Sequence, residues 1–182
     1  MGKTSERIDD RLAVWLKQQR LFFVATAPLA QNGHVNCSPK GGDSFRILDS
    51  LTVAYRDLTG SGAETIAHLR ENGRIVIMFC TFDGPPMIAR LHGRGEVVMP
   101  GHHDFASLMA QFPPNPGTRA IIRVRITRVS ESCGYGVPFF DYREERESLD
   151  KWAQAQGAAK LREYRQAKNV RSIDDLPALD NT

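Results

Sequence analysis

Residues 55–65, Tyr-Arg-Asp-Leu-Thr-Gly-Ser-Gly-Ala-Glu-Thr, have the pattern of a strand end, a glycine loop and the first turn of a helix. Ser61 and Glu64 have the spacing of a capping box, which predicts a helix start near Ser61. Asn72-Gly73 predicts a left-handed end of this helix. Because the first N–H groups of a helix have no intrahelical partner, the loop is a candidate anion site.

The glycine loop matches neither of two common nucleotide-binding motifs. It lacks the third glycine of a dinucleotide fingerprint, and no Gly-Lys-Ser/Thr follows as in a Walker A loop. A plain turn before a helix is therefore the alternative interpretation. If the loop does hold a phosphate or a hydroxyl, the candidate residues are Thr59, Ser61, Gly62 and Thr65.

On both sides of this loop the sequence predicts mostly short strands. Apolar or alternating runs indicate strands at residues 21–27, 34–38, 44–48, 51–57, 74–80, 87–99 and 119–130. Helical patterns cover residues 5–19, 103–111 and 143–168, the last interrupted at Gly157, and residues 172–182 have the pattern of a loose tail. Because the strands follow one another without βαβ repeats, we expect a mainly β fold with peripheral helices, an antiparallel barrel or sandwich.

The composition argues against several classes of protein. A net charge of +3 is too small to indicate a nucleic-acid or membrane partner. No apolar run approaches the roughly 20 residues that span a bilayer, and residues 1–11 lack the apolar core of a signal peptide, so we expect a cytoplasmic location. The three cysteines are far apart and indicate neither a disulfide framework nor a zinc site.

Three other groups of residues have ordinary structural explanations. His102-His103-Asp104 is interpreted as a solvated helix start, because adjacent side chains point in different directions. The arginines of residues 119–128 are interpreted as a salt-bridged outer face, because no aromatic residues alternate with them to stack on RNA bases. Cys37 is interpreted as a buried, inert thiol.

Residues 35–42, Val-Asn-Cys-Ser-Pro-Lys-Gly-Gly, form a second candidate site. Ser38 and Lys40 place a hydroxyl and a cation at the end of a strand, and Gly41-Gly42 permit close approach of a ligand. A strand that simply leads into a loop is the alternative.

Four segments together carry a family resemblance: residues 22–27, 34–42, 57–69 and 78–95. They resemble the pyridoxamine 5'-phosphate oxidase-like proteins, in particular a bacterial and fungal branch of that flavin-binding superfamily. The resemblance covers about residues 5–135, and residues 132–138 and the helical tail are also similar to that branch. It implies a six-stranded antiparallel split β-barrel of the FMN-binding type, dimeric, with FMN in a groove between the subunits.

The resemblance also implies the residues of the site. In such proteins the strand that matches residues 36–40 runs along the flavin ring and ribityl chain, and the loop that matches residues 57–65 holds the phosphate. By position, the expected cofactor-binding residues are Asn36, Cys37, Ser38, Lys40, Thr59, Ser61, Gly62, Thr65 and Arg90. No catalytic residue is assigned and no metal is expected.

One departure from the family concerns the charge at the helix start. Authentic oxidases have a basic pair there, whereas this chain has Ala63-Glu64. A phosphate would then depend on Lys40, Arg46 or Arg56 together with backbone N–H groups. The oxidases' C-terminal substrate-binding signature is also not matched.

The resemblance therefore predicts a flavin-dependent oxidoreductase that acts on a small organic substrate, with FMN as the cofactor. The alternatives are a non-enzymatic dimer that binds a flavin or a phosphorylated metabolite, and a reductase that depends on the deazaflavin F420. We expect a homodimer, because the apolar surfaces of residues 21–27 and 74–80 exceed what one barrel interior needs. Residues 1–140 are predicted to form the FMN-binding domain with its N-terminal helix, and residues 141–182 a helical extension packed on it.

Overall fold

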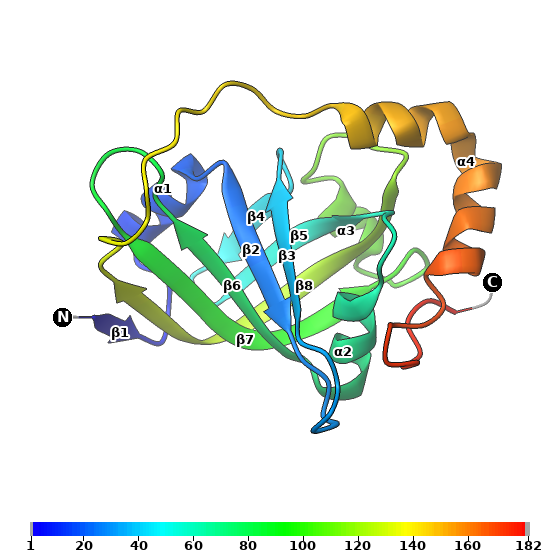
Figure 1. Cartoon of the computed structure of the whole chain (residues 1–182), viewed down its shortest axis with the longest axis horizontal. Helices are drawn as coiled ribbons and strands as arrows, with labels where there is room; N and C mark the ends of the chain where they lie inside the picture. Colours follow the sequence, from blue (N-terminus) through cyan, green and yellow to red (C-terminus); the bar gives the residue numbers. More distant parts are fainter. Residues whose placement is uncertain (1, 181–182) are drawn as a thin grey trace.

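The computed structural model in Figure 1 describes residues 2–180. The elements follow in the order β1 (Lys3–Ser5), α1 (Asp10–Gln18), β2 (Leu21–Thr26), β3 (Asn36–Gly41), β4 (Phe45–Asp49), β5 (Thr52–Leu58), α2 (Glu64–Asn72), β6 (Arg74–Cys80), β7 (Ile88–Val98), α3 (Phe105–Met109), β8 (Thr118–Ser132) and α4 (Ser148–Lys168). The expectation of a mainly β protein with peripheral helices is confirmed. None of the helices described is long and apolar enough to cross a membrane.

One curved antiparallel sheet contains all eight described strands, in the order β3-β2-β6-β7-β8-β5-β4 with β1 paired to β8. The predicted number of six strands is wrong. Strand β8 has fifteen residues and is longer than its partner β5, which pairs with it only as far as Arg125. β1 pairs with the remaining end of β8, at Val129–Glu131. The two outer strands, β3 and β4, follow one another in the sequence, and the curvature of the sheet brings them close together in space. Ser44 Oγ, just before β4, donates to Gly41 O, at the end of β3, at 2.7 Å.

The core lies on the concave side of the sheet and is aromatic at its centre. Phe22, Phe45, Tyr55 and Phe79 have ring centroids 5.0 to 5.7 Å apart. Leu12 and Leu16 of α1 and Ile66 of α2 are fully buried against the same cluster. These contacts fix α2 across the sheet, and its first turn lies beside β3.

Helices α1 and α2 both begin later than the sequence predicts. α1 begins at Asp10 because Asp9 caps it, with Oδ1 accepting from Leu12 N at 2.7 Å, while Ser5 belongs to β1. α2 begins at Glu64, and its N-cap residue Ala63 provides no side-chain cap, so the capping box at Ser61 is wrong. The left-handed end at Gly73 (φ 69°) is confirmed.

The C-terminal residues are more ordered than the loose tail predicted for residues 172–182. Ala178 and Leu179 are buried, and their N–H groups donate to Val170 O and Asn169 O. Residues 181 and 182 lie outside the described part. The predicted interruption of α4 at Gly157 (φ 69°) is confirmed.

Candidate functional site

A cavity of about 920 Å³ lies between β3, the loop after β5, the first turn of α2 and residues 142–150. It brings together six of the nine predicted cofactor-binding residues: Asn36, Ser38, Lys40, Ser61, Gly62 and Thr65. The two candidate segments of the sequence thus form one site. Cavities of this size are typical of cofactor and small-molecule sites.

The wall formed by β3 follows from the two-residue period of a strand. Asn36, Ser38 and Lys40 are half-buried and line the cavity, whereas Cys37 is exposed and lies outside it. The prediction of a buried Cys37 is wrong, because β3 is an outer strand whose other face meets solvent.

Asn36 organises the polar groups at one end of the cavity. Its Nδ2 donates to Thr65 Oγ1 at 3.0 Å and to Thr26 Oγ1 at 3.3 Å, and Ser38 Oγ donates to its Oδ1 at 3.0 Å. Behind them His68 is fully buried, with Nδ1 2.9 Å from Thr26 Oγ1. Burial lowers the pKa of His68, so its ring is neutral at pH 7 and supports this network without adding charge.

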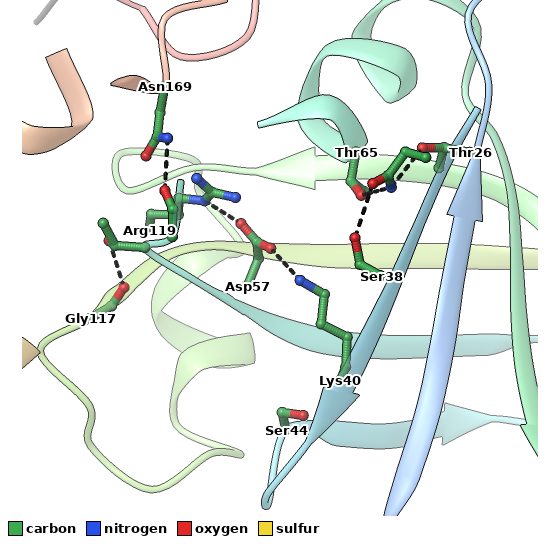
Figure 2. Close-up of polar contacts among 12 residues, drawn as sticks. Thr26, Ser38, Lys40, Ser44, Asp57, Thr65, Gly117, Arg119 and Asn169 are labelled. Carbon is green, nitrogen blue, oxygen red and sulfur yellow. Dashed lines mark hydrogen bonds and ion pairs between the residues drawn. The ribbon is translucent and has the colours of Figure 1, made fainter. Parts of the chain in front are cut away.

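Lys40, Asp57 and Arg119 of the cavity lining form a row of charged contacts, which Figure 2 shows. Lys40 Nζ lies 3.6 Å from Asp57 Oδ1, and Arg119 Nε donates to Asp57 Oδ2 at 2.5 Å. Asp57 and Arg119 side chains are only 1% and 5% exposed, and Arg119 Nη1 has no hydrogen-bond partner among the described residues. Arg56 also lines the cavity, but so do several carboxylates besides Asp57, so the lining as a whole carries no surplus of positive charge.

Arg56 is a further cation of the cavity lining. Its Nη1 donates to Pro113 O at 2.5 Å, and its side chain packs near the ring of Phe112. Burial lowers the pKa of its guanidinium below the ordinary value, although the group stays charged at neutral pH. A negative ligand would relieve this unfavourable burial.

The loop after β5 presents backbone donors. The N–H groups of residues 60–65 have no hydrogen-bond acceptor within residues 2–180. Thr59 faces the other way: it is fully buried, and both its N–H and its Oγ1 donate to Gly117 O. Thr59 therefore shapes the loop and does not line the cavity.

Glu64 replaces the family's basic pair and has no ion-pair partner in the described part of the chain. Its carboxylate folds back over the loop, since a Cβ added to Gly62 would lie 2.2 Å from Glu64 Oε2. A phosphate directly at Gly62 would meet this negative charge. The carboxylate is suited instead to accept hydrogen bonds from hydroxyl groups.

Arg90, the ninth predicted residue, is not brought to the cavity of its own chain. It lies on β7, three strands away from β3, and Nη1 donates to Ser132 Oγ at 3.2 Å. Arg46, considered for the phosphate, is bound by both carboxylate oxygens of Asp43.

The sequence did not reveal two parts of the site. Arg119 was grouped with the outer arginines of β8, of which Arg123 is indeed salt-bridged to Glu96 and Asp104. Residues 142–150 cover the opening: Glu145 accepts from Gly42 N at 3.2 Å and from the Tyr142 hydroxyl at 2.9 Å, and Arg20 stacks on the Tyr142 ring. The alternation of β8 does not indicate that Arg119 is buried. The charged sequence of residues 142–150 does not indicate which surface this segment contacts.

His102, His103 and Asp104 lie apart from this cavity, on the loop before α3. Their potential ligand atoms lie within 4.8 Å of one another, so the argument that these side chains diverge is wrong. Asp104 Oδ2 already accepts from Arg123 Nη1 at 2.7 Å.

Comparisons with known proteins identify the family of this chain. Residues 8–133 match the family model described as pyridoxamine 5'-phosphate oxidase. The pyridoxamine 5'-phosphate oxidase family protein ustO of Aspergillus flavus is 40% identical over 96% of this chain and 76% of its own length.

Two solved structures share the fold at lower identity. HupZ of Group A Streptococcus is 22% identical, with a TM-score of 0.51 over 67% of this chain and 91% of its own. A protein of Lactobacillus delbrueckii that bears the name of the same oxidase family is 17% identical, with a TM-score of 0.53 over 69% of this chain and 94% of its own. These two likenesses concern the fold alone.

Proposed function

Because the chain belongs to the pyridoxamine 5'-phosphate oxidase family, we propose that it binds a flavin, FMN in the first place, and oxidises or reduces a small organic substrate with it. The observation that carries the proposal is the cavity in which the polar face of β3 meets a loop with free N–H groups beside the cations Lys40 and Arg119. Bound flavin would supply the hydride or electron transfer.

The cavity offers cations to a phosphate monoester. Such a group carries about −1.5 to −2 at pH 7, and Lys40, Arg56 and Arg119 are cations of the lining that would face it. The unpartnered, buried Nη1 of Arg119 is a further sign of a missing anionic partner. Lys40 and the N–H groups of the loop would hold the phosphate, and Thr65 would add a hydroxyl.

The remaining residues fit the rest of the flavin. Asn36 uses both Nδ2 hydrogens and its Oδ1 inside the protein, so Ser38 offers an acceptor to the cavity while Thr65 keeps a hydrogen to donate. Glu64 would accept from hydroxyls of the ribityl chain. Residues 142–150 would exclude water from the cavity.

We also propose a homodimer. Tyr135, Phe139 and Phe140 are more than half exposed on the segment that leads to the cavity, which is unusual for a free surface. Arg90 would then reach a flavin across the subunit interface, because it does not line the cavity of its own chain. The cytoplasmic location and the division at residue 140 stay predictions.

The visible spectrum of the protein with and without added FMN tests the proposal. Lys40→Met is expected to weaken FMN binding about 10- to 100-fold, because a charge-assisted contact contributes about 1.5–3 kcal/mol. Lys3→Met is the matched control, since Lys3 is exposed and its partners Asp9 and Glu131 do not line the cavity. Protein that stays colourless in excess FMN would contradict flavin binding.

A non-enzymatic flavin- or metabolite-binding dimer is the second candidate, favoured by Glu64 at the helix start. Turnover separates the two functions. In an oxidoreductase, a reductant bleaches the bound flavin and an acceptor re-oxidises it over many cycles. In a protein that only binds the flavin, this turnover does not occur. Titration with F420 beside FMN tests the deazaflavin alternative.

A further inference from the structure

The C-terminal helix α4 reaches the loop that faces the cavity. Arg165 Nε donates to Thr59 Oγ1 at 2.8 Å, and its Nη2 donates to Thr118 O at 3.0 Å. The guanidinium thus joins the start of the loop to β8. Burial lowers the pKa of Arg165 below its ordinary value, as expected for a cation enclosed by protein.

Asn169, directly after α4, holds the next residue of the loop. Its Nδ2 donates to Gly60 O at 2.9 Å, and its side chain is fully buried (Figure 2). The backbone of Asn169 is itself fixed at both ends, since its N–H donates to Arg165 O and its carbonyl accepts from Leu179 N. The buried C-terminal residues therefore keep this amide in place.

The bond from Asn169 fixes the direction of a donor in the cavity. Gly60 C=O and Ser61 N–H belong to one planar trans peptide, so they point in opposite directions. Because Asn169 holds the carbonyl on the side of α4, the Ser61 N–H is turned away from α4. Ser61 lines the cavity, and its N–H has no acceptor within residues 2–180.

We propose that Asn169 and Arg165 are positioning residues that hold the loop so that Ser61 N–H points toward the phosphate of the ligand. This inference rests on the proposed binding of a phosphorylated flavin. Both residues lie outside residues 8–133, the part that matches the family model. The C-terminal segment of this chain therefore sets how strongly the site selects a phosphorylated ligand.

The chain offers a matched control for this role. Arg70 forms two hydrogen bonds with Asp180, at 2.8 and 2.9 Å, and so also ties the C-terminal residues to the barrel domain. It contacts no residue of the loop or the cavity in the described structure. Replacing Arg70 removes a comparable link without changing the loop.

The experiment compares dissociation constants for FMN and riboflavin, which lacks the phosphate, in wild type, Arg165→Met, Asn169→Leu and Arg70→Met. We expect Arg165→Met and Asn169→Leu to lower the preference for FMN about 3- to 10-fold each, the effect of one lost hydrogen bond. Riboflavin binding should change less than twofold. Arg70→Met should keep the wild-type preference.

Equal losses for both ligands, or an unchanged preference, would overturn the positioning role while leaving flavin binding intact. Wild type that binds neither ligand would instead overturn the proposed function. If a variant of Arg165 or Asn169 does not fold, Thr59→Val tests the contact of Arg165 from the loop side, since it keeps the side-chain shape and removes the hydroxyl that Arg165 contacts. An unchanged preference in Thr59→Val would equally count against the role.

Discussion

At the scale of single residues, Asp57 is the centre of the site. Its buried carboxylate lies between Lys40 and Arg119, so it holds two cations in place beside the cavity. The buried ion pair of Asp57 and Arg119 contributes little net free energy of folding, since the cost of desolvation offsets most of the attraction. Removing one partner is different, because the other charge is left buried and alone.

We therefore predict that Asp57→Asn lowers the free energy of unfolding by about 3–5 kcal/mol, as measured by urea denaturation. Asp43→Asn is the control, because Asp43 pairs with Arg46 at the surface and is expected to cost no more than about 1 kcal/mol. Equal effects of the two substitutions would show that Asp57 is not the buried partner of Arg119.

His68 predicts a dependence of stability on pH. Burial lowers its pKa in the folded protein below 6.5, so the unfolded chain binds a proton first as the pH falls. The free energy of unfolding should then decrease as the pH falls below about 6.5 and continue to decrease down to the folded pKa. His68→Phe should be less stable at pH 7.5 but show a smaller decrease between pH 7.5 and 5. Parallel pH curves for the two proteins would contradict this assignment.

At the scale of elements, local sequence predicted what local contacts determine. The strand at residues 74–80 and the helix end at Gly73 depend on a short apolar run and one left-handed residue, and both are confirmed. The start of α2 was missed because the loop before it is held by Gly117 and Asn169, which are distant in sequence. A capping-box pattern at Ser61 cannot compete with these contacts.

The residues of the candidate site could likewise be predicted only where local sequence determines them. The polar side of β3 follows from alternation, so Asn36, Ser38 and Lys40 were found. Arg119 and Asn169 were missed, because their burial depends on which distant segments cover β8. The hydrophobic periodicity of the sequence does not indicate which distant segments pack together.

The register between β7 and β8 gives an element-level prediction. The register shifts between His92 and Gly93, and a Cβ at Gly93 would lie 2.3 Å from Arg125 O. Gly93→Ala should therefore lower the free energy of unfolding by about 1–3 kcal/mol through overpacking. Gly136→Ala, where a Cβ meets open space, should change it little. Similar thermal stability of both variants would contradict the close approach of the two strands.

At the scale of the whole molecule, the fold joins three distant parts of the chain around one cavity. The outer strand β3, the loop between β5 and α2, and residues 142–150 each supply one side of it. Arg165 and Asn169 do not line the cavity but contact the loop. We propose that this C-terminal part affects ligand preference.

A crystal structure of the protein grown with saturating FMN tests the central claim most directly. We predict flavin density in the cavity beside β3, with the phosphate in contact with Lys40 and Ser61 N–H. Density for the flavin at another place, or a cavity that remains without flavin under these conditions, would contradict the account.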